Sequence, residues 1–409
     1  MPERSPLAPA RFPDLPPVAG VRLAATAAGI RYKGRTDLLL VELAPGTTAA
    51  GVYTRTTMPS APVIWCKTIN AKGRARAIVV NSGNANAFTG KVGDASVKRT
   101  VDGVRAQLGC AAHEVYVAST GVIGEPLPDG KIVAALPALT SSLKAAAWDE
   151  AARAIMTTDT FPKAATRTAR IAGTAVRING IVKGSGMIAP NMGTMLGFVF
   201  TDARLPAAVL RALLRASADR SFNATTVDGD TSTSDTVILC ATGRARHKAV
   251  RGAGDAHLKD FARALDAVMQ DLAQQVVRDG EGAQKLIAIT VKGAVSDASA
   301  RRVGLAIANS PLVKTAIAGE DANWGRLVMA VGKSGERAEQ RKLGIKIGGV
   351  QVAKGGLRVP GYDEAPVARH MKGREIDVEV ELGLGRGRAT VWTCDLTHGY
   401  ISINADYRS

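Results

Sequence analysis

The chain has 409 residues, 46% hydrophobic and 22% charged, which is typical of a soluble protein of two or three domains and excludes disorder of the whole chain. No apolar run reaches the roughly 18 residues that a membrane-spanning helix needs. The net charge is +17, but the basic residues are scattered and only 4% of residues are aromatic. We therefore favour a solvated basic surface, with a nucleic-acid-binding protein as an alternative from another class.

Residues 1–20 are rich in Pro and lack the apolar centre of a secretory signal. We expect them to form a flexible arm at the start of a cytoplasmic protein. The four cysteines lie far apart, without a C-x-x-C pair. This spacing indicates neither a disulfide framework nor a zinc site, and it fits a reducing compartment.

Short β-type runs follow the arm, mixed with helical patterns. Strands are predicted at 37–43, 77–80, 115–118, 196–200, 236–240 and 286–291. Helices are predicted at 95–108 with a stop at Gly109, at 205–217, and at 257–277. Because strict β-α-β alternation is absent, the order predicts a layered α+β protein rather than a doubly wound sheet.

A second, smaller α/β region begins near residue 285. It contains the predicted strand at 286–291, a helix predicted at 300–317 and an alternating strand at 375–382. We therefore treat 285–409 as a C-terminal region with its own secondary structure.

Glycine gathers with Asn, Ser and Thr in four clusters, at 81–90, 118–126, 183–195 and 226–236. Such clusters are turns by default. The backbone N–H groups of tight Gly turns also bind oxyanions and carboxylates, so the four clusters are candidates for a site.

Several familiar catalytic motifs are absent. There is no Walker A string, no G-x-G-x-x-G after a strand and no H-E-x-x-H, and none of the five histidines lies in a G-x-S-x-G context. An enzyme with this sequence therefore needs a base other than His.

Thr194 follows Gly193 and opens an apolar strand at 195–200. A small residue before a Thr at a strand start is the arrangement of a self-cleaving N-terminal nucleophile: the hydroxyl attacks the preceding carbonyl, and the ester that forms is hydrolysed. The freed α-amine, with an unperturbed pKa of roughly 8, then serves as the base for the hydroxyl. From the residues alone, an ordinary turn is the more frequent explanation.

Eight strings in order carry a resemblance to a known family. They are NSGNANAFTG, STGVIG, IMTTDTFPK, KGSGMIAPNMGTML, DGDTSTSDT, DGEGAQK, NSPLVKTAIAGEDANWGR and CDLTHGYISINADY. Together they resemble the bifunctional ornithine acetyltransferase (glutamate N-acetyltransferase, N-acetylglutamate synthase) family of arginine biosynthesis, over roughly residues 15 to 409. The resemblance implies the layered α/β sandwich of self-processing N-terminal-nucleophile acetyltransferases and aminopeptidases.

The resemblance implies a cut between Gly193 and Thr194, giving an α chain and a β chain that stay together. Thr194 is the implied nucleophile that carries the acetyl group, and Thr120 and Gly121 match the oxyanion hole. Two departures stand out: Gly193 stands where the family usually has Ala, and Phe88 where it often has Cys. Gly193 keeps the small residue before the nucleophile.

With this cut, the expected units are the arm at 1–20, the α chain at 21–193, the start of the β chain at 194–284, and the region at 285–409 that closes the site. The positions that match substrate contacts are Thr157, Lys183, Thr194, Glu281, Asn404 and Ser409, with Thr158 and Thr160 as alternatives to Thr157. Taken alone, Lys183 reads as a solvated lysine, and the last residues read as a frayed end.

The implied reaction moves acetyl from N-acetylornithine to Thr194 and then to glutamate, which releases ornithine. Acetyl-CoA replaces N-acetylornithine as donor in bifunctional members. No metal or organic cofactor is implied, and the implied assembly is a heterotetramer of two α and two β chains. The nearest alternative is an aminopeptidase or amidase that uses the same nucleophile and delivers the acyl group to water.

Overall fold

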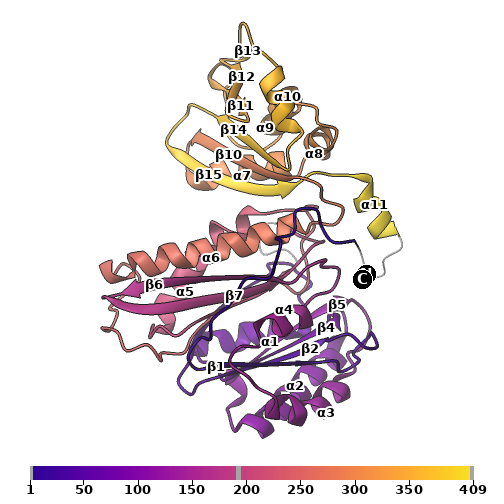
Figure 1. Cartoon of the computed structure of the whole chain (residues 1–409), viewed down its shortest axis with the longest axis vertical. Coiled ribbons are helices and arrows are strands. Elements are labelled where there is room, and N and C mark those ends of the chain that lie inside the picture. Colours follow the sequence, from indigo (N-terminus) through magenta and orange to yellow (C-terminus); the bar gives the residue numbers. More distant parts are fainter. Residues whose placement is uncertain (1–2, 190–194, 406–409) are drawn as a thin grey trace.

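The computed structural model describes residues 3–189 and 195–405, which form three β-sheets with flanking helices (Figure 1). The first sheet has the order β1-β2-β4-β5. Its strands are β1 (Val21–Thr26), β2 (Leu38–Leu43), β4 (Ala77–Asn84) and β5 (Val115–Val122). Its helices are α1 (Ala61–Ile69), α2 (Gly90–Leu108) and α3 (Asp129–Ser141). Helix α2 ends at Gly109 in the left-handed conformation, which confirms the predicted stop.

The second sheet has the order β3-β9-β8-β7-β6 and lies above the first in Figure 1. Its strands are β3 (Thr48–Tyr53), β6 (Lys163–Ile171), β7 (Thr174–Lys183), β8 (Leu196–Thr201) and β9 (Thr236–Ala241). Its helices are α4 (Trp148–Ala154), α5 (Ala207–Asp219) and α6 (Lys259–Arg278). Helices α5 and α6 cover its outer face.

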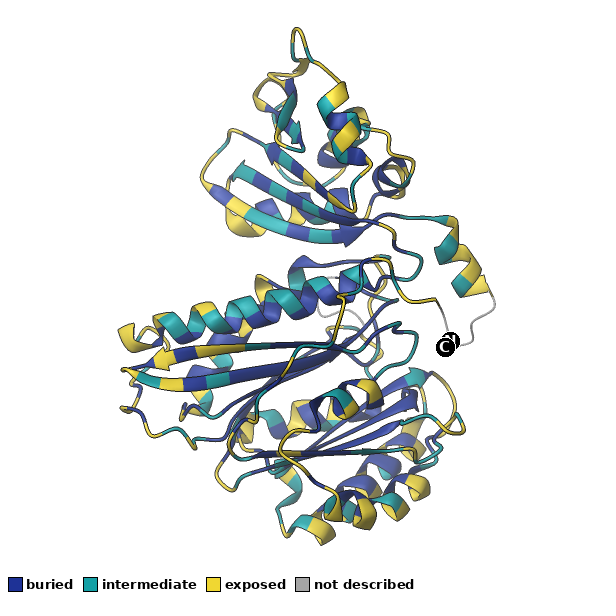
Figure 2. Cartoon of the chain, viewed as in Figure 1, coloured by how far each residue is buried: buried dark blue, intermediate teal, exposed yellow. Residues whose placement is uncertain are grey.

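Strand β8 shows how the layers pack, because side chains along a strand alternate between faces. Phe198 and Phe200 join the core shared with the first sheet, and the Phe200 ring lies 5.7 Å from that of Trp148 in α4. Val199 faces the other way and packs in the core beneath α6, with Leu272. Figure 2 shows this strand layer buried except at the left-hand ends of its long strands, and the exposed parts of α6 on its outer side. These layers confirm the predicted α+β sandwich.

The third sheet has the order β13-β12-β11-β14-β10-β15 and forms the upper part of Figure 1. Its strands are β10 (Leu286–Ala294), β11 (Gly344–Ile347), β12 (Val350–Lys354), β13 (Leu357–Arg358), β14 (Glu375–Glu381) and β15 (Gly387–Cys394). Its helices are α7 (Asp297–Ala308), α8 (Pro311–Ala318), α9 (Trp324–Gly332) and α10 (Ala365–Met371). A separate hydrophobic core lies under this sheet, so the C-terminal region packs as a unit. The last helix, α11 (His398–Ala405), follows β15 and projects from the C-terminal region toward the lower part of the molecule.

Two expectations need correction. The single helix predicted at 300–317 is two helices, α7 and α8, because Pro311 has no N–H and disfavours a helical residue before it. The Pro-rich arm is packed rather than loose over its described residues. Leu7, Leu15 and Val18 are buried, and Ser5 donates its hydroxyl to the Arg278 carbonyl at 2.6 Å.

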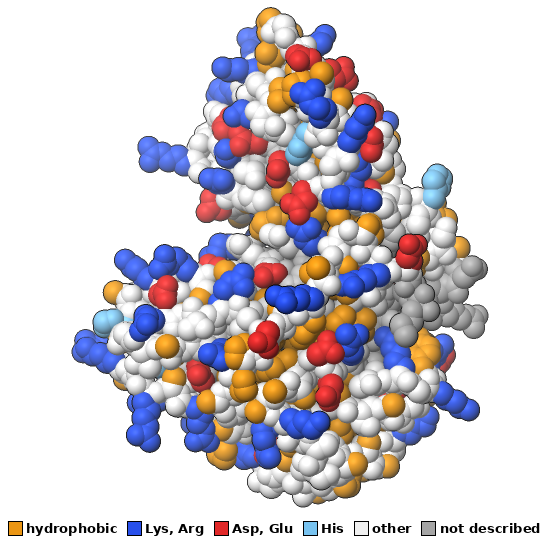
Figure 3. Space-filling view, viewed as in Figure 1, with side chains coloured by type: hydrophobic (Ala, Val, Ile, Leu, Met, Phe, Trp, Pro, Cys, Tyr) orange, Lys and Arg blue, Asp and Glu red, His pale blue; other side chains and the backbone are white. Residues whose placement is uncertain are grey.

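Within the described residues, no helix has the length and apolar character needed to cross a membrane. Lys and Arg side chains are spread over the face shown in Figure 3, with Asp and Glu between them. This distribution is that of a solvated surface.

Candidate active site

One pocket lies where the ends of β5 and β7 meet helix α11 and the loops that follow α4 and α6. Six residues expected in the site line it: Thr120, Gly121, Thr157, Lys183, Glu281 and Asn404. Ser232, Thr233 and Ser234 complete one wall, so the Gly/Ser/Thr cluster at 226–236 also reaches the pocket. Gly193, Thr194 and Ser409 lie outside the described residues.

Gly121 and Thr120 stand at a bulge where β5 pairs in parallel with β4. The backbone of Gly121 has φ +130°, and a Cβ there would lie 2.3 Å from the carbonyl carbon of Gly83. Only glycine fits this close approach of two strands. The bulge thus brings the Thr120 side chain and the Gly121 backbone to the pocket.

Lys183 is the last residue of β7, and it is buried. The expectation of a solvated lysine, drawn from the residue alone, is therefore wrong. Its Nζ donates a hydrogen bond to Oγ1 of Thr120 at 3.2 Å. Because Thr120 Oγ1 accepts this bond, its own proton is free to be donated in another direction. Burial lowers the pKa of Lys183, and the carboxylates of Asp159, Glu281 and Asp235 oppose that shift.

Glu281 follows α6 and lies against the loop after β7. Its N–H donates to the carbonyl of Ser185 at 3.0 Å, and a Cβ at Gly186 would lie 2.4 Å from its Oε2. Asn404 of α11 donates to the same Oε2 at 2.8 Å. The end of the chain therefore reaches the pocket as far as Asn404.

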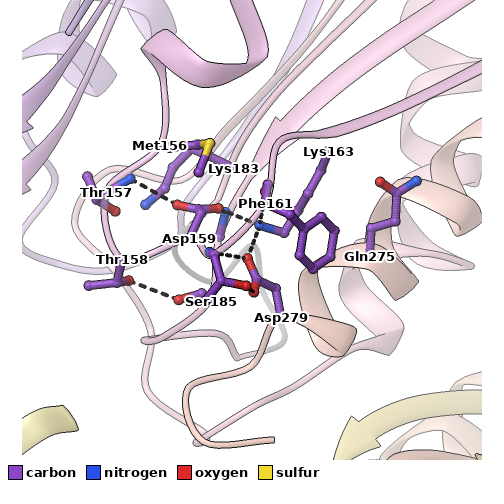
Figure 4. Close-up of polar contacts among 12 residues, drawn as sticks. Met156, Thr157, Thr158, Asp159, Phe161, Lys163, Lys183, Ser185, Gln275 and Asp279 are labelled. Carbon is purple, nitrogen blue, oxygen red and sulfur yellow. Dashed lines mark hydrogen bonds and ion pairs between the residues drawn. The ribbon is translucent and has the colours of Figure 1, made fainter. Parts of the chain in front are cut away.

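A buried ion cluster under the pocket joins these segments (Figure 4). The Nζ of Lys163 lies 2.6 Å from Asp159 Oδ1 and 2.5 Å from Asp279 Oδ2, and all three side chains are fully buried. Asp159 also accepts the N–H of Gly184 at 2.7 Å and that of Thr157 at 3.0 Å. The cluster therefore fixes the backbone beside Lys183 and at Thr157.

The other end of the cluster fixes the loop that carries Glu281. Asp279 lies two residues before Glu281 and accepts the N–H of Thr160 at 2.9 Å and the Thr160 hydroxyl. Thr158 lines the pocket as well, and its hydroxyl shares a 2.9 Å hydrogen bond with Ser185. Of the three threonines weighed for substrate contact, Thr160 is thus engaged in the ion cluster, and Thr157 and Thr158 line the pocket.

The charges within this cluster favour the ionised forms of Lys163 and Asp159. Burial alone would lower the pKa of Lys163, but Asp159 and Asp279 together raise it above its usual value. Burial would raise the pKa of Asp159, but the nearby charges of Lys163 and Lys183 hold it below its usual value. Burial raises the pKa of Asp279, with Lys163 opposing the shift.

Asp159, Lys163 and Asp279 were not foreseen as site residues. The string TTDTFPK reads as a turn, and nothing local shows that its Lys is buried. The sequence offered one signal for this ion cluster: Asp159 and Lys163 are four residues apart, and another aspartate, Asp279, directly follows α6. Phe88, where the family often has Cys, is largely exposed. The described residues contain no group of three or more His, Cys, Asp or Glu side chains placed to hold a metal ion.

Comparison with known proteins identifies the class. A profile of the ArgJ family matches residues 22–409. An arginine biosynthesis bifunctional protein ArgJ from Gluconobacter oxydans is 58% identical over 398 residues, covering 97% of this chain and 94% of the relative. A protein of the same name from Nitrobacter winogradskyi is 57% identical over 412 residues, covering 99% of each chain.

Solved structures include similar proteins. An arginine biosynthesis bifunctional protein from Bacillus halodurans is 40% identical, with a TM-score of 0.49, over 50% of this chain and 96% of that one. An ornithine acetyltransferase from Mycobacterium tuberculosis, solved with ornithine, is 38% identical, with a TM-score of 0.37, over 42% of this chain and 92% of that one.

The full-length similarity places the chain among the acyltransferases of arginine biosynthesis. Within that class it belongs to the ArgJ family, whose curated members are named as bifunctional proteins. The resemblance expected from the eight strings is thereby confirmed.

We predict that Lys163→Met lowers the free energy of unfolding by about 3–5 kcal/mol, because it leaves two carboxylates buried without a cation. Urea unfolding followed by circular dichroism measures the loss. The matched control is Arg153→Met, which breaks the exposed pair with Asp149 on α4 and is expected to cost about 1 kcal/mol or less. Equal effects of the two substitutions would show that the buried cluster adds no more stability than a surface pair.

Proposed function

We propose that the protein transfers acetyl from N-acetylornithine to glutamate through an acetyl group carried on Thr194. The observation that supports this most is one pocket that unites Thr120, Gly121, Lys183 and Glu281 from three segments of the chain. Its lining offers oxyanion donors, a buried cation and a carboxylate side by side. An amino-acid substrate with an α-carboxylate and an amine needs the same set of partners.

In the proposed mechanism the chain first cuts itself between Gly193 and Thr194. The freed α-amine of Thr194 then takes the proton of its own hydroxyl as the oxygen attacks the acetyl carbonyl. The Thr120 hydroxyl and the Gly121 N–H stabilise the oxyanion that forms. Lys183 contributes by donating a hydrogen bond to Oγ1 of Thr120. The hydroxyl proton of Thr120 then points toward the pocket.

Substrate recognition follows from the charges of the pocket. Lys183 attracts the substrate carboxylate, and Glu281, steadied by Asn404, binds its amine. Thr157 and Ser409 complete the proposed contacts. N-acetylornithine and glutamate both carry an α-carboxylate and an α-nitrogen, which is acetylated in the first and free in the second, so one pocket holds each in turn. The acetyl group therefore waits on the protein between them, and acetyl-CoA serves as a second donor.

The fold explains how two fragments stay together after such a cut. Strands β3, β6 and β7 precede residue 194, and β8 and β9 follow it, yet all five form one sheet in which β8 pairs with both β7 and β9. The buried Lys163–Asp279 contact also crosses the cut. We accordingly propose a cytoplasmic assembly of two α and two β chains that needs no metal or organic cofactor.

The first prediction from the proposed function concerns the cut itself. The purified wild-type protein is expected to give two masses in an intact mass spectrum, for residues 1–193 and 194–409. Thr194→Ala lacks the hydroxyl that attacks the preceding carbonyl and is expected to remain one chain, whereas Thr158→Ala keeps that hydroxyl and is expected to be cut. An active wild-type protein with a single mass would refute the proposed processing.

A second prediction concerns the acetyl intermediate. N-acetylornithine alone is expected to release ornithine in a burst close to the enzyme concentration, with the second fragment heavier by one acetyl group. Adding glutamate is expected to discharge it and yield N-acetylglutamate. Initial-rate plots for the two substrates should be parallel. Intersecting lines without any gain in mass would indicate direct transfer, and discharge that is independent of glutamate would favour the aminopeptidase or amidase alternative.

A third prediction separates oxyanion stabilisation from substrate binding. Thr120→Ala is expected to lower kcat by about 10²–10³ with little change in KM, because an oxyanion donor acts on charge that develops in the transition state. Thr120→Ser keeps the hydroxyl and is the matched control. If steady-state kinetics show only a higher KM for the Ala variant, Thr120 acts in ground-state binding instead.

A further inference from the structure

Helix α11 reaches the pocket, yet none of its side chains is buried. A helix of this length is marginal on its own, so its stability comes from contacts with the rest of the chain. Asn404 on this helix lines the pocket and donates an amide N–H to Oε2 of Glu281 at 2.8 Å. The position of Asn404 beside Glu281 therefore depends on the contacts that hold α11 in place.

Tyr400, in the first turn of α11, connects Asn404 to another part of the site. Its carbonyl accepts an N–H of the same Asn404 amide at 3.0 Å, and this bond orients the amide toward Glu281. Its hydroxyl donates to Oδ2 of Asp228 at 3.4 Å. Burial and the nearby carboxylates of Asp228 and Glu281 raise the pKa of Tyr400, so the hydroxyl keeps the proton that it donates.

Asp228, in the cluster at 226–236, is itself fixed to the wall of the pocket. Its Oδ2 also accepts the N–H of Met187 at 2.6 Å, and its Oδ1 accepts those of Ile188 at 3.0 Å and Asp230 at 3.1 Å. Met187 lines the pocket and has φ +57°, a left-handed conformation that is uncommon for a residue with a side chain. The Asp228 carboxylate therefore stabilises a turn of the pocket wall and holds α11 against it.

The turn that carries Glu281 is shaped to receive the start of α11. Gly282 has φ +76°, and a Cβ there would lie 2.4 Å from the backbone nitrogen of Tyr400. Its carbonyl accepts the Thr397 hydroxyl at 2.7 Å. Only glycine allows so close an approach. Helix α11 thus packs directly beside the carboxylate that is proposed to bind the substrate amine.

We propose that Asp228 is a positioning residue for substrate binding, which acts through Tyr400 and Asn404 on Glu281. This role rests on the proposed function, in which Glu281 binds the substrate amine. With the Tyr400 hydroxyl on Asp228, the Asn404 amide fixes the direction of the Glu281 carboxylate. Without that contact α11 separates from the pocket wall more often. The freed carboxylate then binds an amine more weakly, because binding has to order it.

The first test removes only the hydroxyl, with Tyr400→Phe. Hydrogen exchange followed by mass spectrometry is expected to show the amides of α11 exchanging about tenfold faster, the lower end of what a hydrogen bond to a carboxylate contributes to an opening equilibrium. Calorimetric titration is expected to give a dissociation constant for ornithine about threefold to tenfold higher. Tyr362→Phe is the matched control: Tyr362 lies in the C-terminal region, outside the pocket lining, and both values are expected to stay at those of wild type.

A double-mutant cycle separates this role from a general loss of structure. In an Asn404→Ala background, Tyr400→Phe is expected to change the ornithine dissociation constant by less than about twofold, because the connection to Glu281 is already broken. Asp228→Asn turns one acceptor into a donor that faces a backbone N–H, and it is expected to weaken ornithine binding at least as much as Tyr400→Phe. The kcat of Tyr400→Phe is expected to stay within about threefold of wild type, since the loss lies in binding.

The outcomes are distinct. The role of Asp228 would be overturned if Tyr400→Phe left either the exchange of α11 or the ornithine affinity within about twofold of wild type. Equal losses from Tyr400→Phe with and without Asn404, or a lower kcat at an unchanged dissociation constant, would overturn it as well. A wild-type protein that does not bind ornithine would contradict the proposed function itself, and no variant is needed to see that result. The exchange of α11 tests the contact of Tyr400 with Asp228 in either case.

Discussion

The buried contact of Lys163 with Asp159 and Asp279 is the interaction on which the site depends most. A lysine without solvent needs both carboxylates to stay charged, and the carboxylates need it in return. The remaining acceptor positions of the two aspartates bind backbone N–H groups of Thr157, Gly184 and Thr160. This one ion cluster therefore fixes the positions of three loops that meet at the pocket.

The central sheet imposes a second constraint. Its middle strand, β8, begins just after the proposed cut, and its two neighbours come from opposite sides of that cut. The backbone hydrogen bonds of a central strand and the packing of Phe198 and Val199 on its two faces do not require a continuous chain at residue 194. A break there is therefore compatible with an intact core, which makes the strand start a suitable place for a reactive terminus.

The pocket separates charges that would otherwise pair. Lys183 donates to the Thr120 hydroxyl, and the Glu281 carboxylate accepts from Asn404. The carboxylates of Glu281 and Asp235 lie close enough to Lys183 to oppose the lowering of its pKa by burial. Unpaired charge in a buried pocket destabilises the fold, and the ion cluster beneath offsets that cost with a fully satisfied network.

The sequence by itself determined the features that depend on residues close together along the chain. Apolar periodicity defined α6, Gly109 ended α2, and eight strings in order identified the family and six residues of the pocket. Tertiary structure decided the rest, because burial depends on distant segments. Lys163 and Asp279 are 116 positions apart, and Met195 and Asp235 are 40 apart. No local pattern shows that these side chains leave water together, and only the packed sheets bring a lysine or a carboxylate into a dry interior where its partners must be supplied.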